Sequence, residues 1–122
     1  MSFRLNKYQL EKYSRQIILK DVGALGQKKI IKSKVLIVGM GGLGCPVAEF
    51  LTRAGIGNIG IVDFDKVDLS NIHRQSLFNL KDLKKSKVVA AKKKLNKINT
   101  QTKVKCYNLK LNKKNKSKII KK

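Results

Sequence analysis

Four closely spaced glycines could hold a phosphate group. Gly39, Gly41 and Gly44 fit the pattern G-x-G-x-x-G, and Gly42 lies inside it. In this pattern the first glycine permits a tight turn, the second lets the backbone approach a phosphate, and the third lets a helix pack closely against a strand. The free N–H groups at the start of the following helix attract an anion. The segment 35–51 therefore predicts a nucleotide-binding loop.

An acidic residue stands at the distance that this motif requires. Asp63 follows Gly44 by 19 residues and comes at the end of a second apolar run, where a carboxylate binds ribose hydroxyls. The alternative is a glycine turn without a ligand. The glycines alone do not distinguish ATP from NAD, so the choice depends on the residues that follow.

The elements that must position these residues alternate between strand and helix. The runs 34–39, 59–64 and 103–109 are typical of strands, and the first two are continuously apolar, as in buried parallel strands. Periodic segments predict helices over 7–19, with Asn6 as N-cap, over 44–54 and over 86–99. A break at 23–27 precedes a short helix to about residue 32. The segment 65–75 reads as a loop, and 112–122 as a lysine-rich end.

Each predicted helix has an apolar face that we expect to turn toward the core. These faces are Leu10, Tyr13 and Ile17 in the first helix, Val47, Phe50, Leu51 and Ala54 in the second, and Val88, Ala91, Leu95 and Ile98 in the third. The order β-α-β-α-β predicts an α/β fold with a Rossmann-like parallel sheet and flanking helices.

The domain organisation follows from this order. We expect one domain, with an N-terminal helical segment over 1–33 and a partial Rossmann-like nucleotide-binding region over 34–122. Three strands make half of a doubly wound sheet, and one edge then lacks its usual neighbour. We therefore expect an N-terminal fragment of a larger fold, or a sheet that a partner completes.

The composition limits the classes of function. The net charge is +22, and 17 of the 29 basic residues lie in 81–122, which invites a nucleic-acid interpretation. Only four basic residues are arginines, the better readers of bases and phosphates. Lys, Asn and Ile share A/T-rich codons, so we interpret the tail as a solvated lysine surface and expect no nucleic-acid partner.

Compartment and metal content are also constrained. No stretch reaches the ~18 apolar residues of a membrane span, and no apolar segment with a cleavage site follows Met1, so we expect a cytoplasmic protein without membrane contact. Cys45 and Cys106 form no CxxC pair, which argues against a zinc site and against a disulfide framework.

The segments around the glycine loop resemble the ThiF/MoeB/HesA family, the adenylating enzymes related to ubiquitin-activating enzymes. The resemblance covers about residues 8–99. It rests on four blocks in order, "YSRQIIL" (13–19), "GQKKI" (26–30), "VLIVGMGGLGCPVAEFLTRAGIGNIGIVDFDKVDLSNIHRQSLF" (35–78) and "KSKVVAAKKKLNKIN" (85–99). The stretch "DLSNIHRQ" is not what a dehydrogenase usually carries after its ribose acid, so the resemblance favours ATP.

The resemblance implies an activity. Members of this family use ATP and Mg²⁺ to adenylate the C-terminal Gly-Gly carboxylate of a ubiquitin-like sulfur carrier protein, in thiamine or molybdopterin biosynthesis. They work as dimers. Such a site needs cations and backbone N–H donors more than an acid or a base, because a carboxylate must attack an anionic phosphate.

The resemblance also implies roles for single residues. Gly39, Gly41, Gly42 and Gly44 would form the ATP loop, Asp63 would bind ribose, and Asn71, Arg74 and Lys87 would bind phosphates, with Arg15 entering the active site of the other subunit and Gln75 supporting the loop. From composition alone, Lys87 and Arg74 also fit solvated surface charges. We rank catalysis by His73, a reactive thiol at Cys45 and a metal role for Asp65 and Asp68 below these assignments.

The sequence also departs from the family pattern. The magnesium-binding aspartate of the family follows the next strand, and residue 122 comes before it, as it does before the zinc-binding CxxC pairs. We therefore expect this polypeptide alone to bind ATP weakly and to turn over poorly. Two alternatives stay open: a non-catalytic nucleotide-binding or dimerisation remnant of the family, and an NAD-dependent oxidoreductase domain.

Overall fold

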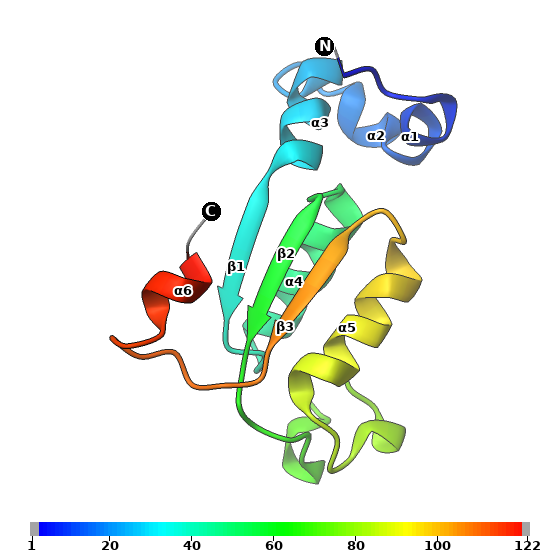
Figure 1. Cartoon of the computed structure of the whole chain (residues 1–122). Coiled ribbons are helices and arrows are strands. Elements are labelled where there is room, and N and C mark those ends of the chain that lie inside the picture. Colours follow the sequence, from blue (N-terminus) through cyan, green and yellow to red (C-terminus); the bar gives the residue numbers. More distant parts are fainter. Residues whose placement is uncertain (1–2, 121–122) are drawn as a thin grey trace.

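The computed structural model describes residues 3–120. Its elements alternate between strand and helix after a helical N-terminal region (Figure 1). In chain order they are α1 (Lys7–Lys12), α2 (Ser14–Ile17), α3 (Gly23–Lys32), β1 (Lys34–Val38), α4 (Gly44–Ala54), β2 (Asn58–Val62), η1 (Leu69–Asn71), η2 (Leu80–Asp82), α5 (Lys87–Ile98), β3 (Lys103–Tyr107) and α6 (Lys116–Ile120). The α/β prediction is confirmed.

The three strands form one parallel sheet in the order β1-β2-β3. Ile37 pairs with Ile61, and Ile61 with Cys106, so these side chains share one face of the sheet. Helices α4 and α5 pack against each other on that face (Figure 1). The main apolar core lies in this layer, and both β2 and β3 end two residues before their predicted ends because the chain turns away at Asp63 and Asn108.

The opposite face of the sheet is more open and more polar. One row across the strands is Lys34, Asn58 and Lys103. Tyr107 and Leu36 lie over Gly60, where an added Cβ would meet the Leu36 side chain at 2.9 Å. The short helix α6, which the sequence reading did not predict, lies against this face.

The N-terminal region differs from the single predicted helix. Asn6 caps α1 as predicted, and its side chain accepts from the backbone N–H of Gln9 at 2.8 Å. The helix ends at Tyr13, whose backbone leaves the helical region, and α2 starts anew. Tyr13 is 1% exposed, whereas Leu10 of the predicted inner face is 46% exposed. The kink turns Tyr13 inward and Leu10 outward.

The predicted break at 23–27 was wrong. Gly23 has φ +60 and ends the preceding turn, and helix α3 begins there and runs through the whole "GALGQ" segment. Glycine marks the entry to a helix here because it can adopt the left-handed conformation that the turn requires. Gln27, inside the segment, is fully buried.

The predicted inner face of α4 was wrong at Val47 and Phe50, whereas Leu51 packs against the core as predicted. Cys45, Ala48 and Thr52 are buried against the body of the protein. Val47 and Phe50 are 47% and 64% exposed. The small inward side chains bring the helix axis close to the sheet, and the large apolar ones are left outside. By contrast, Val88, Ala91 and Leu95 of α5 are buried as predicted.

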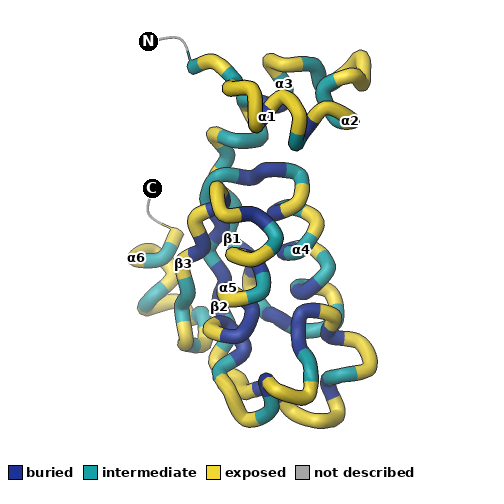
Figure 2. Tube along the Cα trace, turned by 90° about the vertical axis from the view of Figure 1, so that its right-hand side faces the viewer, coloured by how far each residue is buried: buried dark blue, intermediate teal, exposed yellow. Residues whose placement is uncertain are grey.

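Buried amides join the N-terminal helices to the sheet region. Asn99 donates to the Tyr13 hydroxyl and to the Thr52 carbonyl, both at 3.0 Å. Gln27 donates to the Ala54 carbonyl at 2.9 Å. Exposed positions predominate in α1–α3, while buried stretches run through the sheet and its helices (Figure 2).

Candidate nucleotide-binding site

The glycine loop follows β1 and leads directly into α4. Gly39 has φ +96, and its N–H donates to the Val62 carbonyl at 2.7 Å, which holds the turn against the end of β2. A Cβ on Gly44 would lie 1.9 Å from the Gly39 carbonyl oxygen. The first and third glycines of the motif are therefore required by the loop itself.

Gly41 and Gly42 are not required in this way. Their φ values lie outside the left-handed region, since the positive-φ glycines in the described chain are at 23, 39 and 55. A Cβ on Gly42 would meet Arg74 Cδ at 3.5 Å, an ordinary contact, and one on Gly41 would lie 3.7 Å from Gln75 Nε2. The folded chain gives these two positions no steric need for glycine.

Asp63 directly follows β2, and its carboxylate accepts hydrogen bonds from two backbone N–H groups. Its Oδ2 accepts from Met40 N in the glycine loop at 2.7 Å, and its Oδ1 accepts from Asp65 N at 2.8 Å. Each carboxylate oxygen has a second lone pair for a further donor. The carboxylate thus fixes the loop while remaining able to accept hydrogen bonds from a ligand.

The loop after β2 is ordered by its own side chains. Asp68 and Asn71 form a reciprocal cap on η1: Ser70 N donates to Asp68 Oδ2 and Asp68 N donates to Asn71 Oδ1, both at 3.0 Å. The Ser70 hydroxyl, followed by the Ser70 N–H, holds the pKa of Asp68 below its ordinary value. Asn71 is buried in this arrangement.

Arg74 reaches back over the glycine loop. Its Nη1 donates to the Ser70 carbonyl at 2.9 Å and lies 3.4 Å from His73 Nε2, while its aliphatic stem lies beside Gly42. Gln75 is buried, and its Oε1 has no hydrogen-bond partner in the described structure. His73 is exposed at the surface of the same loop.

Lys87 is the first residue of α5 and is 6% exposed. Its backbone N–H donates to the Asp65 carbonyl at 3.0 Å. Within residues 3–120 the ion pair found joins Arg53 to Glu49, so neither Lys87 nor Arg74 has a carboxylate within 4.0 Å. In the part of the chain that the structure describes, Arg74, whose stem lies beside Gly42, and Lys87, whose backbone is bonded to Asp65, are therefore cations without carboxylate partners and suited to an anion.

Arg15 lies far from the glycine loop of its own chain. It is exposed on α2, whose neighbour Gln16 donates to the Ala54 carbonyl at the C-terminal end of α4. The glycine loop is at the other end of α4, and the two regions occupy opposite ends of the sheet (Figure 1). The structure therefore does not bring Arg15 to the glycine loop of its own chain.

A hollow of about 280 Å³ adjoins Gly39 and Asp63. Phe64, Leu109 and Lys110 also line it, and Lys110 Nζ lies 5.9 Å from the centre of the Phe64 ring. The sequence reading missed these three residues. Their positions gave a signal, because Phe64 follows β2 and Leu109 and Lys110 follow β3, and the segments after parallel strands meet at the carboxyl edge of the sheet.

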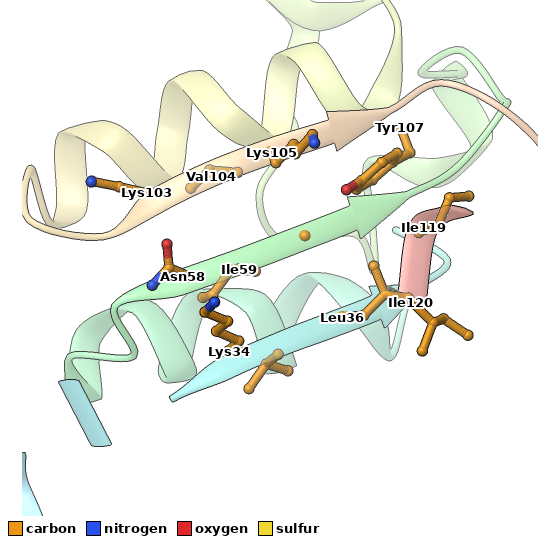
Figure 3. Close-up of a pocket in the computed structure, with 12 residues that line it drawn as sticks. Lys34, Leu36, Asn58, Ile59, Lys103, Val104, Lys105, Tyr107, Ile119 and Ile120 are labelled. Carbon is orange, nitrogen blue, oxygen red and sulfur yellow. The ribbon is translucent and has the colours of Figure 1, made fainter. Parts of the chain in front are cut away.

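A larger hollow of about 580 Å³ lies on the open face of the sheet, away from the glycine loop (Figure 3). Its lining includes Lys34, Lys103 and Lys105, with Ile119 and Ile120 of α6 at one end. None of the candidate site residues lines it. The smaller hollow, by contrast, is lined by Gly39 and Asp63, and we therefore place the site at this edge of the sheet.

The remaining candidates have structural explanations. Cys45 is fully buried, its Sγ lies 3.5 Å from the Met40 carbonyl, and burial raises the pKa of the thiol, which disfavours a reactive thiolate. In residues 3–120 no three His, Cys, Asp or Glu side chains cluster closely enough to hold a metal ion. Over the same residues, no helix has the length and apolar character needed to cross a membrane.

The fold is Rossmann-like, and its glycine loop, acidic residue and cations gather at the carboxyl edge of the sheet, where such folds hold nucleotides. Residues 13–122 match the ThiF family, and the chain belongs to this family. The resemblance inferred from the sequence is thereby confirmed.

Two relatives and one solved structure illustrate the similarity. Adenylyltransferase and sulfurtransferase MOCS3 of Drosophila virilis is 47% identical over 91% of this chain and 25% of its own length. Sulfur carrier protein adenylyltransferase of Thermus thermophilus is 39% identical over 96% of this chain and 43% of its own length. The crystal structure of E. coli MccB with ATP superposes with a TM-score of 0.81 at 31% identity, over 96% of this chain and 36% of that chain. The chain therefore spans between a quarter and less than half of these proteins.

Proposed function

We propose that this chain forms the ATP-binding part of an adenylyltransferase that activates the C-terminal Gly-Gly carboxylate of a ubiquitin-like sulfur carrier protein. The observation on which this rests most directly is the pair Gly41 and Gly42, where the folded chain has no steric need for glycine. Close approach of a ligand to the backbone explains the missing side chains. Two relatives named as adenylyltransferases and a neighbour solved with ATP support the choice of ligand.

The proposed reaction requires positive charge near the reacting oxygens, and this site supplies it. A carboxylate oxygen attacks the α-phosphorus of ATP, the bond from that phosphorus to the bridging oxygen of the β-phosphate breaks, and pyrophosphate leaves with both electrons. Negative charge gathers on oxygens throughout. In the proposed site Arg74 and Lys87 meet this charge, and Lys87 acts from a largely buried position where its field is less screened.

The other residues bind and orient the nucleotide. Gly42 would contact the phosphates through its backbone, and Asp63 would accept the ribose hydroxyls with the lone pairs that Met40 N and Asp65 N leave free. Asn71 would donate its side-chain amide to a phosphate. The hollow beside Phe64 would receive the base.

Mg²⁺ accompanies ATP in such reactions, and it offsets phosphate charge. The described residues do not supply a ligand set for it, since no group of three His, Cys, Asp or Glu side chains that could hold a metal ion is present within 3–120. In this proposal the metal is therefore bound through the phosphates of the nucleotide, and none of the residues described here is assigned to it.

Arg15 requires a second copy of the chain. Because it lies at the far end of the sheet from the glycine loop, it could serve this site only in a dimer, as Arg15 of the partner subunit. We therefore include a homodimer in the proposal.

The test is ATP–pyrophosphate exchange that depends on a Gly-Gly carrier, compared between the unchanged chain, Arg74→Ala and the control Arg4→Ala. Arg4 is exposed and belongs to none of the site segments. We expect Arg74→Ala to reduce exchange by about 100-fold or more, the usual loss when one charge-stabilising group is removed. Where the unchanged chain supports exchange, equal rates for Arg74→Ala and Arg4→Ala would overturn the assignment of Arg74. Where it does not, the stabilisation of the two variants by ATP is compared instead, and equal thermal shifts would overturn the assignment.

A thermal-shift titration tests the ligand separately. A ligand that binds the folded state raises its stability by RT ln(1 + [L]/Kd). ATP should stabilise the chain and NAD should not. Stabilisation by ATP without any carrier-dependent exchange would favour a nucleotide-binding remnant of the family, and stabilisation by NAD alone would favour an oxidoreductase domain.

A further inference from the structure

The basic residues in the second part of the chain are not balanced by acidic ones. All seven acidic residues of the chain lie in 1–82, whereas 83–122 holds 16 lysines and no acidic residue. A/T-rich codons account for a high lysine content. Both parts are encoded by one gene, however, so codon usage alone does not explain why carboxylates are missing from only one of them. The region that contains α5, β3 and α6 therefore has a positive surface of its own.

Helix α5 collects several of these lysines on one side. Its exposed residues recur at helical spacing and so share one side of the helix: Val89, Lys92, Lys93, Asn96 and Lys97. The opposite side of the helix is buried in the apolar core. We call the exposed side the lysine face of α5.

The lysines of this face have no partner in their own chain. Within residues 3–120 the ion pair found lies on α4, so no lysine of this face has a carboxylate within 4.0 Å. A group of like charges that the protein does not neutralise creates a potential that attracts an anionic partner. The lysine face is thus free to pair with carboxylates or phosphates from another molecule.

The edge strand β3 lies beside α5 and is also basic (Figure 1). Lys103 and Lys105 are exposed on the side of β3 opposite the covered face, where Cys106 points. Burial raises the pKa of the Cys106 thiol and the charge of Lys92 opposes this shift, which places the Lys92 ammonium near β3. This edge of the sheet is therefore positive on both sides, and two copies of it would repel each other.

The residue types on the lysine face favour a protein partner over a nucleic acid. Arginine, the better reader of bases and phosphates, does not occur in 75–122. The one aromatic residue of 81–122 is Tyr107, and Lys105 Nζ already lies 5.3 Å from the centre of its ring, where a base would have to stack. Val89, 48% exposed, instead gives the face an apolar side chain beside its lysines. An apolar centre with a charged rim is the usual anatomy of a protein interface.

We propose that the lysine face of α5 binds a protein partner whose surface carries carboxylates around an apolar side chain. The carboxylates pair with Lys92, Lys93 and Lys97, and the apolar side chain packs on Val89. Lys93 and Lys97 are four residues apart, which is about 6 Å along the helix axis at 1.5 Å per residue. Two glutamates four residues apart on a partner helix have the same spacing. A second copy of this chain does not fit, because its own lysine face is positive.

Fluorescence anisotropy with a defined probe tests this partner. The probe is a labelled amphipathic helical peptide with glutamates four residues apart beside a row of leucines, used at low salt, where charges are least screened. Lys93→Glu combined with Lys97→Glu should weaken binding about tenfold or more, since like charges then face one another. The matched control combines Lys20→Glu with Lys29→Glu, two exposed positions of the N-terminal region, and changes the net charge equally.

The comparison of the two double variants decides whether the lysine face is a site. Unchanged binding by the control variant would support it. Equal losses in the two double variants would show that the peptide responds to the net charge of the chain and would overturn the proposal. Failure of the unchanged chain to bind the peptide would also overturn it. Far-UV circular dichroism confirms that the variants are folded.

A second probe distinguishes a protein partner from a nucleic acid. It is a single-stranded oligonucleotide with the same net charge as the peptide, and the unchanged chain should bind the peptide more tightly. Val89→Ser removes the apolar contact without changing any charge, so it should weaken peptide binding about threefold and leave oligonucleotide binding unchanged. Tighter binding of the oligonucleotide, or unchanged peptide binding by Val89→Ser, would overturn the proposal. These measurements need no ATP, so their result does not depend on the proposed function.

Discussion

The backbone N–H of Met40 donates to Asp63 Oδ2 at 2.7 Å, which joins the glycine loop to the end of β2 across 23 residues. The other oxygen of Asp63 accepts from Asp65 N, and the Asp65 carbonyl accepts from Lys87 N. One path of hydrogen bonds therefore runs from the glycine loop to the first residue of α5. Asp63 positions the loop whether or not a ligand is present.

Removal of the Asp63 carboxylate should loosen the loop. Asp63→Ala leaves the N–H of Met40, which is fully buried, without its acceptor, and an unsatisfied buried donor costs about 1–3 kcal/mol. We expect faster hydrogen exchange at the Met40 amide, lower stability and weaker ATP binding. The control is Asp21→Ala at an exposed position. An unchanged exchange rate at Met40 would contradict the positioning role.

Alanine substitutions at the glycines of the loop should differ in their effect on the free energy of unfolding. Gly44→Ala forces a Cβ to 1.9 Å from the Gly39 carbonyl oxygen, so the loop must shift, and we expect a loss of at least about 3 kcal/mol of unfolding free energy. Gly42→Ala meets only ordinary contacts and reduces the freedom of the unfolded chain. It should leave stability unchanged or raise it by about 0.4–1 kcal/mol.

Nucleotide binding should separate Gly42→Ala from the unchanged chain, although stability should not. Although Gly42→Ala is predicted to be stable, its methyl group would occupy the space through which a phosphate approaches the backbone. We expect the thermal shift produced by ATP to fall sharply in this variant. Denaturant unfolding and the ATP titration together provide the test. A Gly42→Ala protein that binds ATP as well as the unchanged chain would remove the main support for the nucleotide site.

The loop after β2 offers a prediction about pH. The Ser70 hydroxyl is the largest influence that lowers the pKa of Asp68, so Ser70→Ala should raise this pKa toward its ordinary value. A lowered pKa in the folded state stabilises the protein above the pKa of the unfolded state, and this contribution is lost as the pH falls through the folded-state pKa. The variant should lack part of this contribution near neutral pH. NMR titration of the Asp68 carboxyl carbon measures it, with Ser117→Ala as the control.

Strands and the glycine loop could be predicted from the sequence because their signals are local. The runs around Ile37 and Ile61 are rich in β-branched residues, which is a strand signal although β1 buries only Ile37 and leaves Val38 58% exposed. Glycine at 39 and 44 is required by the turn itself. The order of the elements then determined the parallel sheet. These signals can be read along the chain without knowledge of the contacts between distant residues that complete the sheet.

The faces of helices were harder to predict. The periodicity of α4 shows an apolar stripe at Val47 and Phe50, but it does not show whether the stripe faces the core or the solvent. Tyr13 ends a helix because its ring is buried and its hydroxyl accepts from Asn99, 86 residues away. The hydrogen bond by which Asp63 holds the glycine loop likewise depends on Met40, which lies 23 residues earlier. The buried face of α4, the end of the helix at Tyr13 and the hydrogen bond of Asp63 all depend on tertiary contacts. Such contacts cannot be inferred from a single sequence.

The Asn99 amide should hold the N-terminal helices to the body of the protein. Its side chain donates to the Tyr13 hydroxyl and the Thr52 carbonyl, and its Oδ1 accepts from Lys12 Nζ at 2.8 Å and from Gln101 N at 3.0 Å. Asn99→Ala removes all four bonds at a site that is 1% exposed. We expect a loss of about 2–4 kcal/mol of unfolding free energy.

The matched control is Asn96→Ala, the same substitution one turn earlier on the exposed side of α5. Urea unfolding should give the control a midpoint close to that of the unchanged chain, and Asn99→Ala a clearly lower one. Hydrogen exchange should also quicken in α1–α3 before it does in the sheet, because the lost bonds are those that tie Tyr13 and Lys12 to the ends of α4 and α5. If Asn99→Ala lowers stability equally in all elements, the amide contributes to the core as a whole and does not join two parts of the chain.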